Sequence, residues 1–105
     1  MATTSEIGNA GERIVANALM DMRYDTNVYT RLPGSTDIEA IQNGRKLFVQ
    51  VKATVWPSTP SSLSSEEERS SKSRATRLGC EPWEAKVQLD TSLRLVGNIE
   101  WRNLA

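Results

Sequence analysis

The stretch that decides the fold is Gly34-Ser-Thr-Asp-Ile-Glu-Ala-Ile-Gln-Asn-Gly-Arg-Lys-Leu-Phe-Val-Gln-Val-Lys-Ala-Thr54. Two segments in which apolar and polar residues alternate flank the pair Asn43-Gly44. An Asn-Gly pair favours a two-residue hairpin turn, because both residues tolerate positive φ. A turn at these two residues pairs the flanking strands so that Asp37 lies directly opposite Gln50.

This pairing also determines which side chains share a face of the hairpin. Directly paired residues point to the same side, with Cβ atoms about 4.5–5.5 Å apart, so Glu39 shares a side with Phe48. Lys52, two residues beyond Gln50, is a diagonal neighbour of Asp37 on that side. The hairpin therefore predicts that an acid, an amide and a lysine meet on one side of a strand. The opposite face of the second strand carries an apolar stripe: Leu47, Val49, Val51 and Ala53.

Asp37, twelve intervening residues and then Gln50-Val-Lys52 resemble the core motif of the PD-(D/E)xK nuclease superfamily. In that superfamily an Asp opens one strand of a hairpin, an acid-x-Lys sequence lies on the partner strand, and a preceding helix commonly bears a Glu. Glu12, in Gly8-Asn-Ala-Gly-Glu-Arg-Ile-Val-Ala16, matches the helical Glu. The chain is most similar to small archaeal-type Holliday-junction resolvases, whose helix–Gly–Pro–strand return resembles residues 77–87.

The resemblance implies an α/β fold with a restriction-endonuclease-like mixed β-sheet flanked by helices, in the order αβββαββ. It implies a Mg²⁺-dependent DNA endonuclease, with Mn²⁺ as a substitute metal and no small-molecule cofactor. Branched DNA is the expected substrate, because so short a chain has no room for a sequence-recognition domain, and cutting two strands calls for a homodimer. The implied catalytic residues are Glu12, Asp37, Gln50 and Lys52, and the implied metal ligands are Asp37, Gln50 and Glu12.

Two positions depart from the superfamily pattern. Gln50 stands where Glu or Asp is usual, and Thr36 stands where a Pro commonly precedes the Asp. Gln-x-Lys variants occur in the superfamily, and an amide oxygen can ligate Mg²⁺, but it supplies no charge, so a hard cation binds more weakly. Glu39, on the same side as Asp37, is therefore a hypothetical replacement carboxylate and a further metal ligand.

The neutral Gln50 also keeps a second interpretation open. In it the chain is a nuclease-like module that binds nucleic acid or a protein partner without cutting, or an accessory subunit of a restriction or mobile-element system. The composition agrees with this alternative: 13 Lys and Arg residues balance 13 Asp and Glu residues, so the formal net charge is zero. A neutral chain argues against strong nonspecific attraction to nucleic acid and leaves only a local basic patch.

Composition excludes several other classes of site. The chain has no histidine, so Ser-His-Asp and Cys-His catalysis and His-containing metal sites are excluded. Cys80 is the single cysteine, which excludes an internal disulfide and fits a reducing compartment. No long apolar segment predicts a membrane span or a signal peptide, so we expect a cytoplasmic protein. A length of 105 residues predicts one domain, residues 1–105.

Periodicity predicts the remaining elements. Apolar residues recur at helical spacing near the N-terminus, after a first segment, residues 1–6, that we expect to fray. Ser64 or Ser65 is expected to cap a second, lightly packed helix, and Gly79 is expected to stop it. Besides the hairpin, the expected elements are a helix from residue 7 or 9 to 22, a strand over 26–32, a helix that opens with residues 66–68 and ends near 78, a strand over 83–89, and a strand over 93–101 or a bent hairpin there around Gly97-Asn98.

Each candidate site residue also has a purely structural interpretation. Asn9 and Glu12 have the spacing of a capping box, and Asp37 is a common residue type at the start of a strand. Lys52 can extend from a strand end to water or form a surface ion pair of little energetic value. Gln50 can be a polar spacer.

Two further sets are candidates for contact with nucleic acid. Basic residues on the second helix and at the hairpin tip either contact phosphates or are simply solvated; they are Arg45, Lys46, Lys72, Arg74 and Arg77. Trp56 and Trp83 either stack on bases or belong to the core or an oligomer contact.

Overall fold

The computed structural model describes residues 2–32 and 35–105, and for residues 28–32 and 35–37 it describes the backbone without the side chains. The α/β class and the predicted order αβββαββ are confirmed. The elements are α1 (Thr4–Asp21), β1 (Asp25–Leu32), β2 (Ser35–Gln42), β3 (Arg45–Val55), α2 (Ser65–Leu78), β4 (Glu81–Leu89) and β5 (Glu100–Asn103).

The β2–β3 hairpin has the predicted register. It bends at Asn43-Gly44, where φ is 47° and 83°. Positive φ at both central residues is the geometry that an Asn-Gly turn favours, because it matches the twist of the two strands. The strands pair outward from Gln42 and Arg45, and Asp37 lies opposite Gln50.

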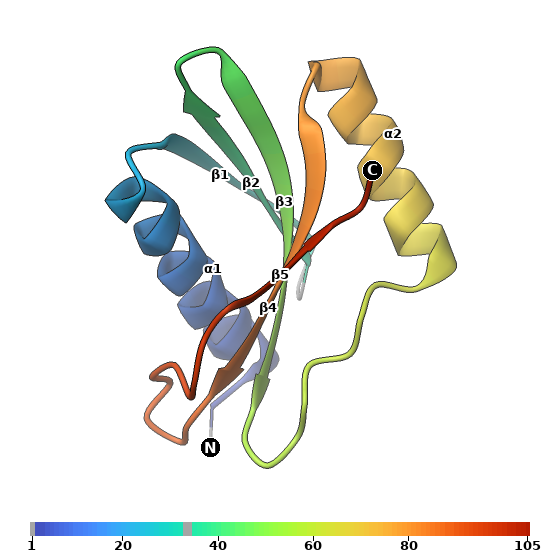
Figure 1. Ribbon diagram of the computed structural model, residues 1–105. Coiled ribbons are helices and arrows are strands. Elements are labelled where there is room, and N and C mark those ends of the chain that lie inside the picture. Colours follow the sequence, from blue (N-terminus) through green and yellow to red (C-terminus); the bar gives the residue numbers. More distant parts are fainter. Residues whose placement is uncertain (1, 33–34) are drawn as a thin grey trace.

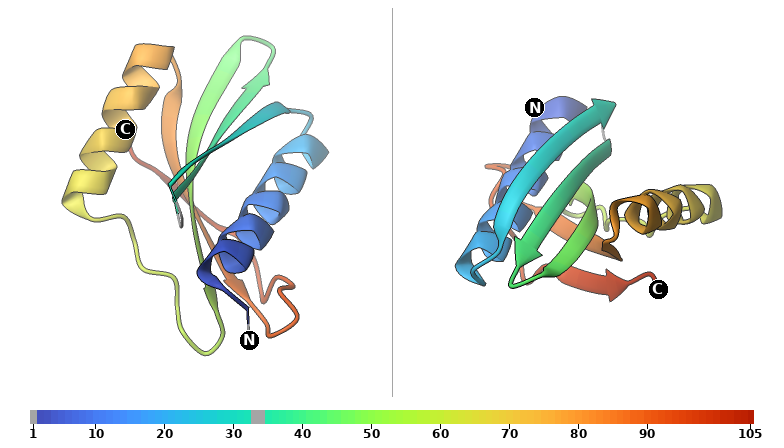
Figure 2. Two further views of the ribbon diagram at one scale, coloured as in Figure 1. Left: turned by 180° about the vertical axis from the view of Figure 1, so that it is seen from behind. Right: turned by 90° about the horizontal axis from the view of Figure 1, so that it is seen from above.

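The five strands form one mixed sheet in the order β1-β2-β3-β4-β5. β3 and β4 are parallel, and the other neighbouring pairs are antiparallel. A parallel pair requires a crossover connection, and α2 lies in the connection from β3 to β4 (Figure 1). The two helices lie on opposite sides of the sheet (Figures 1 and 2).

α1 packs very closely against the apolar face of the sheet. A Cβ added at Gly11 would lie 2.7 Å from the Cβ of Ala53 and 3.0 Å from a methyl group of Val87. Only a glycine permits this approach of helix to sheet. The main core lies between them and comprises Ala10, Val15, Ala16, Leu19, Tyr24, Ile38, Ala40, Leu47, Val49, Val51, Ala85, Val87 and Leu89.

α2 packs lightly on the other face, as predicted. It buries only Ser71 and Ala75 among its residues. Ser64 is its N-cap and forms a capping box with Glu67, and Gly79 ends the helix with φ at 69°. The expected caps are therefore confirmed, with Ser64 rather than the next serine at the start.

α1 begins earlier than the apolar pattern predicts. Thr3 is its N-cap: Thr3 Oγ1 accepts the N–H of Glu6 at 3.1 Å, and Glu6 Oε1 accepts the N–H of Thr3 at 3.0 Å. The predicted start at residue 7 or 9, the fraying of residues 4–6 and the capping box of Asn9 with Glu12 are therefore wrong. A reciprocal cap satisfies the first N–H groups of a helix without any apolar residue, so periodicity alone misses this first turn.

The last predicted strand is also wrong over most of its length. Where a strand, or a bent hairpin around Gly97-Asn98, was expected over 93–101, β5 spans Glu100–Asn103, and Leu95 forms an isolated bridge with Leu89. Leu93 and Gly97 have φ of 63° and 72°, and the Asp90 carboxylate accepts two backbone N–H groups of the turn that follows it. These local bonds bend the chain away from an extended conformation.

None of the helices in residues 2–32 and 35–105 is long and apolar enough to cross a membrane.

Gly11→Ala is expected to lower the free energy of unfolding by about 1–3 kcal/mol, because the added methyl group overlaps the Ala53 side chain in a packed interior. Gly8→Ala, in the same helix, is the matched control, since a Cβ at Gly8 meets nothing within 4 Å. It is expected to raise the free energy of unfolding by about 0.5–1 kcal/mol through helix propensity. Urea unfolding followed by circular dichroism measures both, and equal effects would contradict the close packing of α1.

Candidate functional site

The polar side of β3 faces α2 and carries Gln50 and Lys52. Successive strand residues point to opposite faces, and the contacts of Val51 and Ala53 with α1 assign those two to the other face. Gln50 is only 6% exposed, and Lys52 is partly buried. Asp37 is the strand partner of Gln50, but its side chain lies outside the part of the chain that the structure describes.

Lys52 forms an ion pair with Glu67 of α2. Its Nζ donates to Glu67 Oε2 at 2.7 Å, and the carboxylate is about half exposed. The hydrogen bond from Lys52 lowers the pKa of Glu67, and the backbone N–H of Ser64 lowers that pKa further. The lysine of the motif is therefore held at the N-terminus of α2.

The capping box explains why Glu67 reaches β3. Glu67 Oε1 accepts the N–H of Ser64 at 3.1 Å, while Ser64 Oγ accepts the N–H of Glu67 at 3.2 Å. This reciprocal pair turns the Glu67 side chain back toward the start of the helix, where its other oxygen meets Lys52. Reasoning from the sequence did not single out Glu67, although its place three residues after a serine cap was the available signal.

A cavity of about 230 Å³ lies between β3 and α2. Within it the Oγ of Ser71 is buried, and it has no hydrogen-bond partner among the described residues. Such a group usually binds water or a ligand, since an unpaired buried hydroxyl is costly. The cavity is lined by Gln50, Glu66, Glu67, Ser70, Ser71 and Arg74.

A larger cavity, of about 490 Å³, lies beside the end of β3. There β3 continues to Val55, past Val51, the last residue paired with β2 in the described register. Lys52 lines this cavity and also contacts Glu67, which lines the smaller one. Lys52 therefore lies between the two cavities. The larger one is lined by Thr4, Ile7, Gly8, Val51, Lys52, Ala53, Thr54, Val55, Ser58 and Ser61.

Glu84 is a fully buried carboxylate beside Gln50, its partner on β3. Arg102 Nε and Nη2 donate to its two oxygens at 3.1 and 3.3 Å, and the N–H of Leu63 donates at 2.7 Å. Burial by itself raises the pKa of Glu84, but the hydrogen bonds from Arg102 and Leu63 outweigh burial and hold the pKa below its ordinary value. Both oxygens of Glu84 therefore accept hydrogen bonds, and Glu84 connects β4 to β5 and to the segment before α2. Sequence reasoning missed this role because the partners of Glu84 are distant in the chain.

The other two candidate carboxylates come from elements other than β3. Glu12 is on α1, the helix that packs against the opposite face of β3, one turn after Gly8, which lines the larger cavity. Glu39 lies opposite the buried Phe48. It is near Cys80: burial raises the pKa of that thiol, and the charge of Glu39 raises it further.

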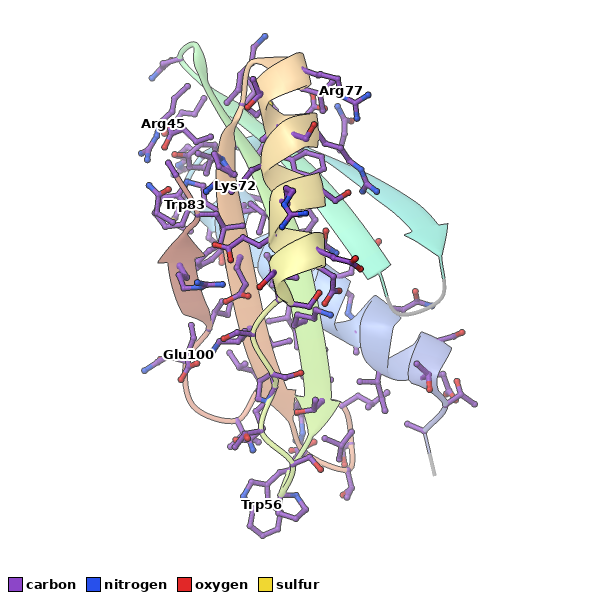
Figure 3. All side chains as sticks on the ribbon, turned by 90° about the vertical axis from the view of Figure 1, so that its right-hand side faces the viewer. Arg45, Trp56, Lys72, Arg77, Trp83 and Glu100 are labelled. Atoms are coloured by element: carbon purple, nitrogen blue, oxygen red, sulfur yellow. The ribbon has the colours of Figure 1, made fainter. Side chains whose placement is uncertain are left out.

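The predicted basic residues fall into three environments. Arg45 is paired through two hydrogen bonds, of 2.8 and 3.1 Å, with Glu81. Arg74 lines the smaller cavity. Lys46 at the hairpin tip is exposed, as are Lys72 and Arg77 on α2, both labelled with Arg45 in Figure 3.

The two candidate tryptophans, Trp56 and Trp83, differ in exposure. Trp83 packs against the main core and donates from Nε1 to Glu81 Oε1 at 3.4 Å. Trp56 is 61% exposed at the end of β3 (Figure 3). Val55 and Ser58, which flank Trp56 in the chain, line the larger cavity. The Trp56 side chain is therefore an exposed aromatic group close to that cavity.

The chemistry of the donors around Gln50 fits a hard divalent cation. Among the described side chains no three Asp, Glu, His or Cys residues gather as a ready metal site. The smaller cavity is also lined by the Arg74 guanidinium, but it presents oxygen donors of the kind that Mg²⁺ and Mn²⁺ accept, among them the Gln50 amide, the Glu67 carboxylate and the Ser71 hydroxyl, for which no partner is found among the described residues.

Solved structures share this arrangement of helices and strands. Among those that match is the 1.6 Å resolution structure of Archaeoglobus fulgidus Hjc, a Holliday junction resolvase from an archaeal hyperthermophile. It superposes with a TM-score of 0.62 over 92% of this chain and 72% of that chain, at 18% sequence identity. The chain has the fold of a Holliday junction resolvase.

The restriction-endonuclease-like fold expected from the hairpin motif is thus confirmed. No protein-family model matches the chain, and no curated protein matches it significantly. The similarity to the resolvase therefore lies in the arrangement of helices and strands. Because the sequence identity is only 18%, this similarity establishes the fold alone.

Arg102→Leu is expected to lower the free energy of unfolding by about 2 kcal/mol at pH 7, because it leaves the buried Glu84 carboxylate without its cation. This loss is smaller than the loss expected on breaking a fully buried ion pair, because water reaches the half-exposed arginine. Arg94→Leu, which breaks an exposed pair with Asp90, is the control and is expected to change stability by less than about 0.5 kcal/mol.

The same variant is expected to change the pH dependence of stability. In the wild type the depressed pKa of Glu84 contributes stability above the ordinary pKa of a glutamate, and this contribution is lost as the pH falls through the folded-state value. Without Arg102 the pKa of Glu84 is higher, so Glu84 takes up its proton in the folded state more readily, the variant loses less stability than the wild type as the pH falls, and the two curves converge. Urea midpoints between pH 7 and pH 4 measure this, and parallel curves for wild type and variant would contradict the role of Arg102.

Proposed function

We propose that the protein is a divalent-metal-dependent endonuclease that hydrolyses phosphodiester bonds of branched DNA. The observation that carries this proposal is the β2–β3 register, which pairs Asp37 with Gln50 and places Lys52 on the same strand face within a resolvase fold. Hjc, the structural neighbour, is a Holliday junction resolvase. The oxygen donors around Gln50 support the metal requirement.

We assign a separate role in metal binding or catalysis to each residue of the site. Asp37 and Gln50 would hold a Mg²⁺ or Mn²⁺ ion through carboxylate and amide oxygens, with Glu12 a further candidate ligand one turn after Gly8 of the larger cavity. Such an ion, when bound, polarises the scissile phosphate and acidifies the attacking water. Lys52 would donate hydrogen bonds from Nζ to that water or to a phosphate oxygen, where its charge stabilises the developing negative charge.

Exposed cations at the hairpin tip and along α2 support binding to a DNA backbone. Lys46, Lys72 and Arg77 are exposed, and exposed cations contact phosphates without reading sequence. Arg45 already pairs with Glu81 and would have to exchange that partner. A homodimer would place two such sites on one junction and cut two strands symmetrically.

Cleavage of a four-way junction, a nicked duplex and a linear duplex in titrations of Mg²⁺ and Mn²⁺ tests the proposal. Asp37→Ala and Lys52→Ala are each expected to lower the junction cleavage rate about 100-fold or more, because each removes a group that acts on the phosphate. Arg94→Ala, in an exposed turn, is the control and is expected to cut at the wild-type rate. Two symmetric cuts and a dimer in sedimentation of the complex are expected; metal-independent cutting, or cutting retained in both variants, would refute the enzyme.

A non-catalytic nucleic-acid-binding module is the second candidate function. Two observations favour it: Gln50 lacks a charge, and the Lys52 ammonium is already paired with Glu67. This module would bind the junction without cutting it, and its affinity would fall steeply with salt, because phosphate contacts release counterions.

Trp56→Ala is expected to weaken junction binding about fivefold or more at fixed salt, because stacking of an exposed tryptophan on a base contributes about 1–3 kcal/mol. Trp101→Ala is the matched control, since Trp101 is also an exposed tryptophan but lies on β5. Fluorescence anisotropy of labelled junctions measures both affinities. Equal affinities for the two variants would exclude stacking by Trp56.

A further inference from the structure

The neutral amide of Gln50 leaves the proposed metal site short of one carboxylate, and the structure places another carboxylate beside it. Glu67 Oε2 lies 2.7 Å from Lys52 Nζ, and Lys52 is two residues from Gln50 on the same face of β3. Glu67 and Gln50 also line the same 230 Å³ cavity. The acid that the strand lacks is therefore present on the first turn of α2.

We propose that Glu67 supplies the carboxylate that Gln50 does not, and that it binds the divalent cation together with the Gln50 amide oxygen and the Ser71 hydroxyl. This inference rests on the proposed function, because it assigns a ligand to the same metal site. It adds to that function a residue from a different element, 17 positions after Gln50 in the sequence.

The hydroxyl of Ser71 is an independent observation that points to a ligand in this cavity. Ser71 is 1% exposed, and its Oγ has no hydrogen-bond partner among the described residues. Ser71 follows Glu67 by four residues, so both lie on one face of α2, the face toward β3. A buried hydroxyl beside a carboxylate and an amide oxygen is a set of hard donors.

The other nearby carboxylates are less suited to this role. Glu84 is fully buried, lines neither cavity and has both oxygens bonded to Arg102 and Leu63, whereas Glu66 lines the same cavity as Glu67. Glu39 lies opposite the buried Phe48. Among the described carboxylates, Glu67 is the one that contacts the lysine of the motif.

The capping box prepares Glu67 for this role. Its Oε1 is held by the N–H of Ser64, which leaves Oε2 directed at Lys52 and the cavity. A carboxylate fixed in this way loses little conformational freedom on binding a cation. Binding of a cation by Glu67 Oε2 would release Lys52 Nζ from this pair, and Lys52 would then donate to water or, when DNA is bound, to a phosphate oxygen.

Binding of Mn²⁺ alone tests the inference without measuring cleavage. Titration of the full chain, with free Mn²⁺ followed by electron paramagnetic resonance, is expected to give a Kd at least about tenfold higher for Glu67→Gln than for the wild type. Glutamine still completes a capping box, so the fold is retained, as urea unfolding verifies. Glu68→Gln, one residue along and directed toward Arg102, is the matched control and is expected to bind within twofold of the wild type.

A rescue variant distinguishes ligation from a structural role. Gln50→Glu combined with Glu67→Gln is expected to restore Mn²⁺ affinity to within about threefold of the wild type, because a carboxylate returns to the cavity from the strand. If the wild type binds Mn²⁺ and Glu67→Gln binds it equally well, the role of Glu67 is refuted and the proposed function stands. If the wild type neither binds millimolar Mn²⁺ nor cuts junctions, the proposed function fails, and the inference fails with it.

Discussion

Antiparallel pairing of β2 with β3 is the constraint on which both the core and the candidate site depend. Because successive residues of β3 point to opposite faces, Val49 and Val51 belong to the core under α1, while Gln50 and Lys52 face α2. A shift of one residue in the pairing would place the lysine in the core and the valines in water. The requirement to bury the valines therefore also orients the polar residues of the site.

The N-terminus of α2 is the second part of the site. Its capping box has a local function, the satisfaction of the first N–H groups of the helix, and it also turns Glu67 toward Lys52. The helix buries little apolar surface, so contacts at its ends matter to its position. One such contact is the N–H of Leu63, just before the cap, which donates to the buried Glu84.

Glu84 connects three segments that are distant in sequence. It lies on β4, accepts from the backbone before α2, and pairs with Arg102 of β5. This arrangement holds the start of α2 near β3, where the small cavity forms. The chain shares its fold with the archaeal resolvase at only 18% sequence identity. A fold survives such divergence because packed layers tolerate many apolar substitutions of similar volume. Polar contacts such as those of Glu84 can therefore differ between two proteins of the same fold.

The sequence by itself determined the order of elements, the bend at Asn43-Gly44 and the pairing of Asp37 with Gln50. These follow from local chemistry: a turn type that needs positive φ, alternation of apolar residues along a strand, and a serine cap followed by acidic residues in the first turn of a helix. The first turn of α1 was missed because a cap needs no apolar pattern, and the bend after Asp90 was missed because side chain-to-backbone bonds override strand periodicity.

Only the tertiary structure brought Glu67 to Lys52 and Glu84 to Arg102. Both pairs join residues from different elements, whose distance depends on how α2 and β5 pack against the sheet and not on any local pattern. The placement of Glu12 on the opposite face of β3 was likewise decided by packing, since Gly11 lets α1 approach that face closely. Spacing along the chain predicts which residues share a strand face, but a contact between two elements depends on the packing of the whole molecule.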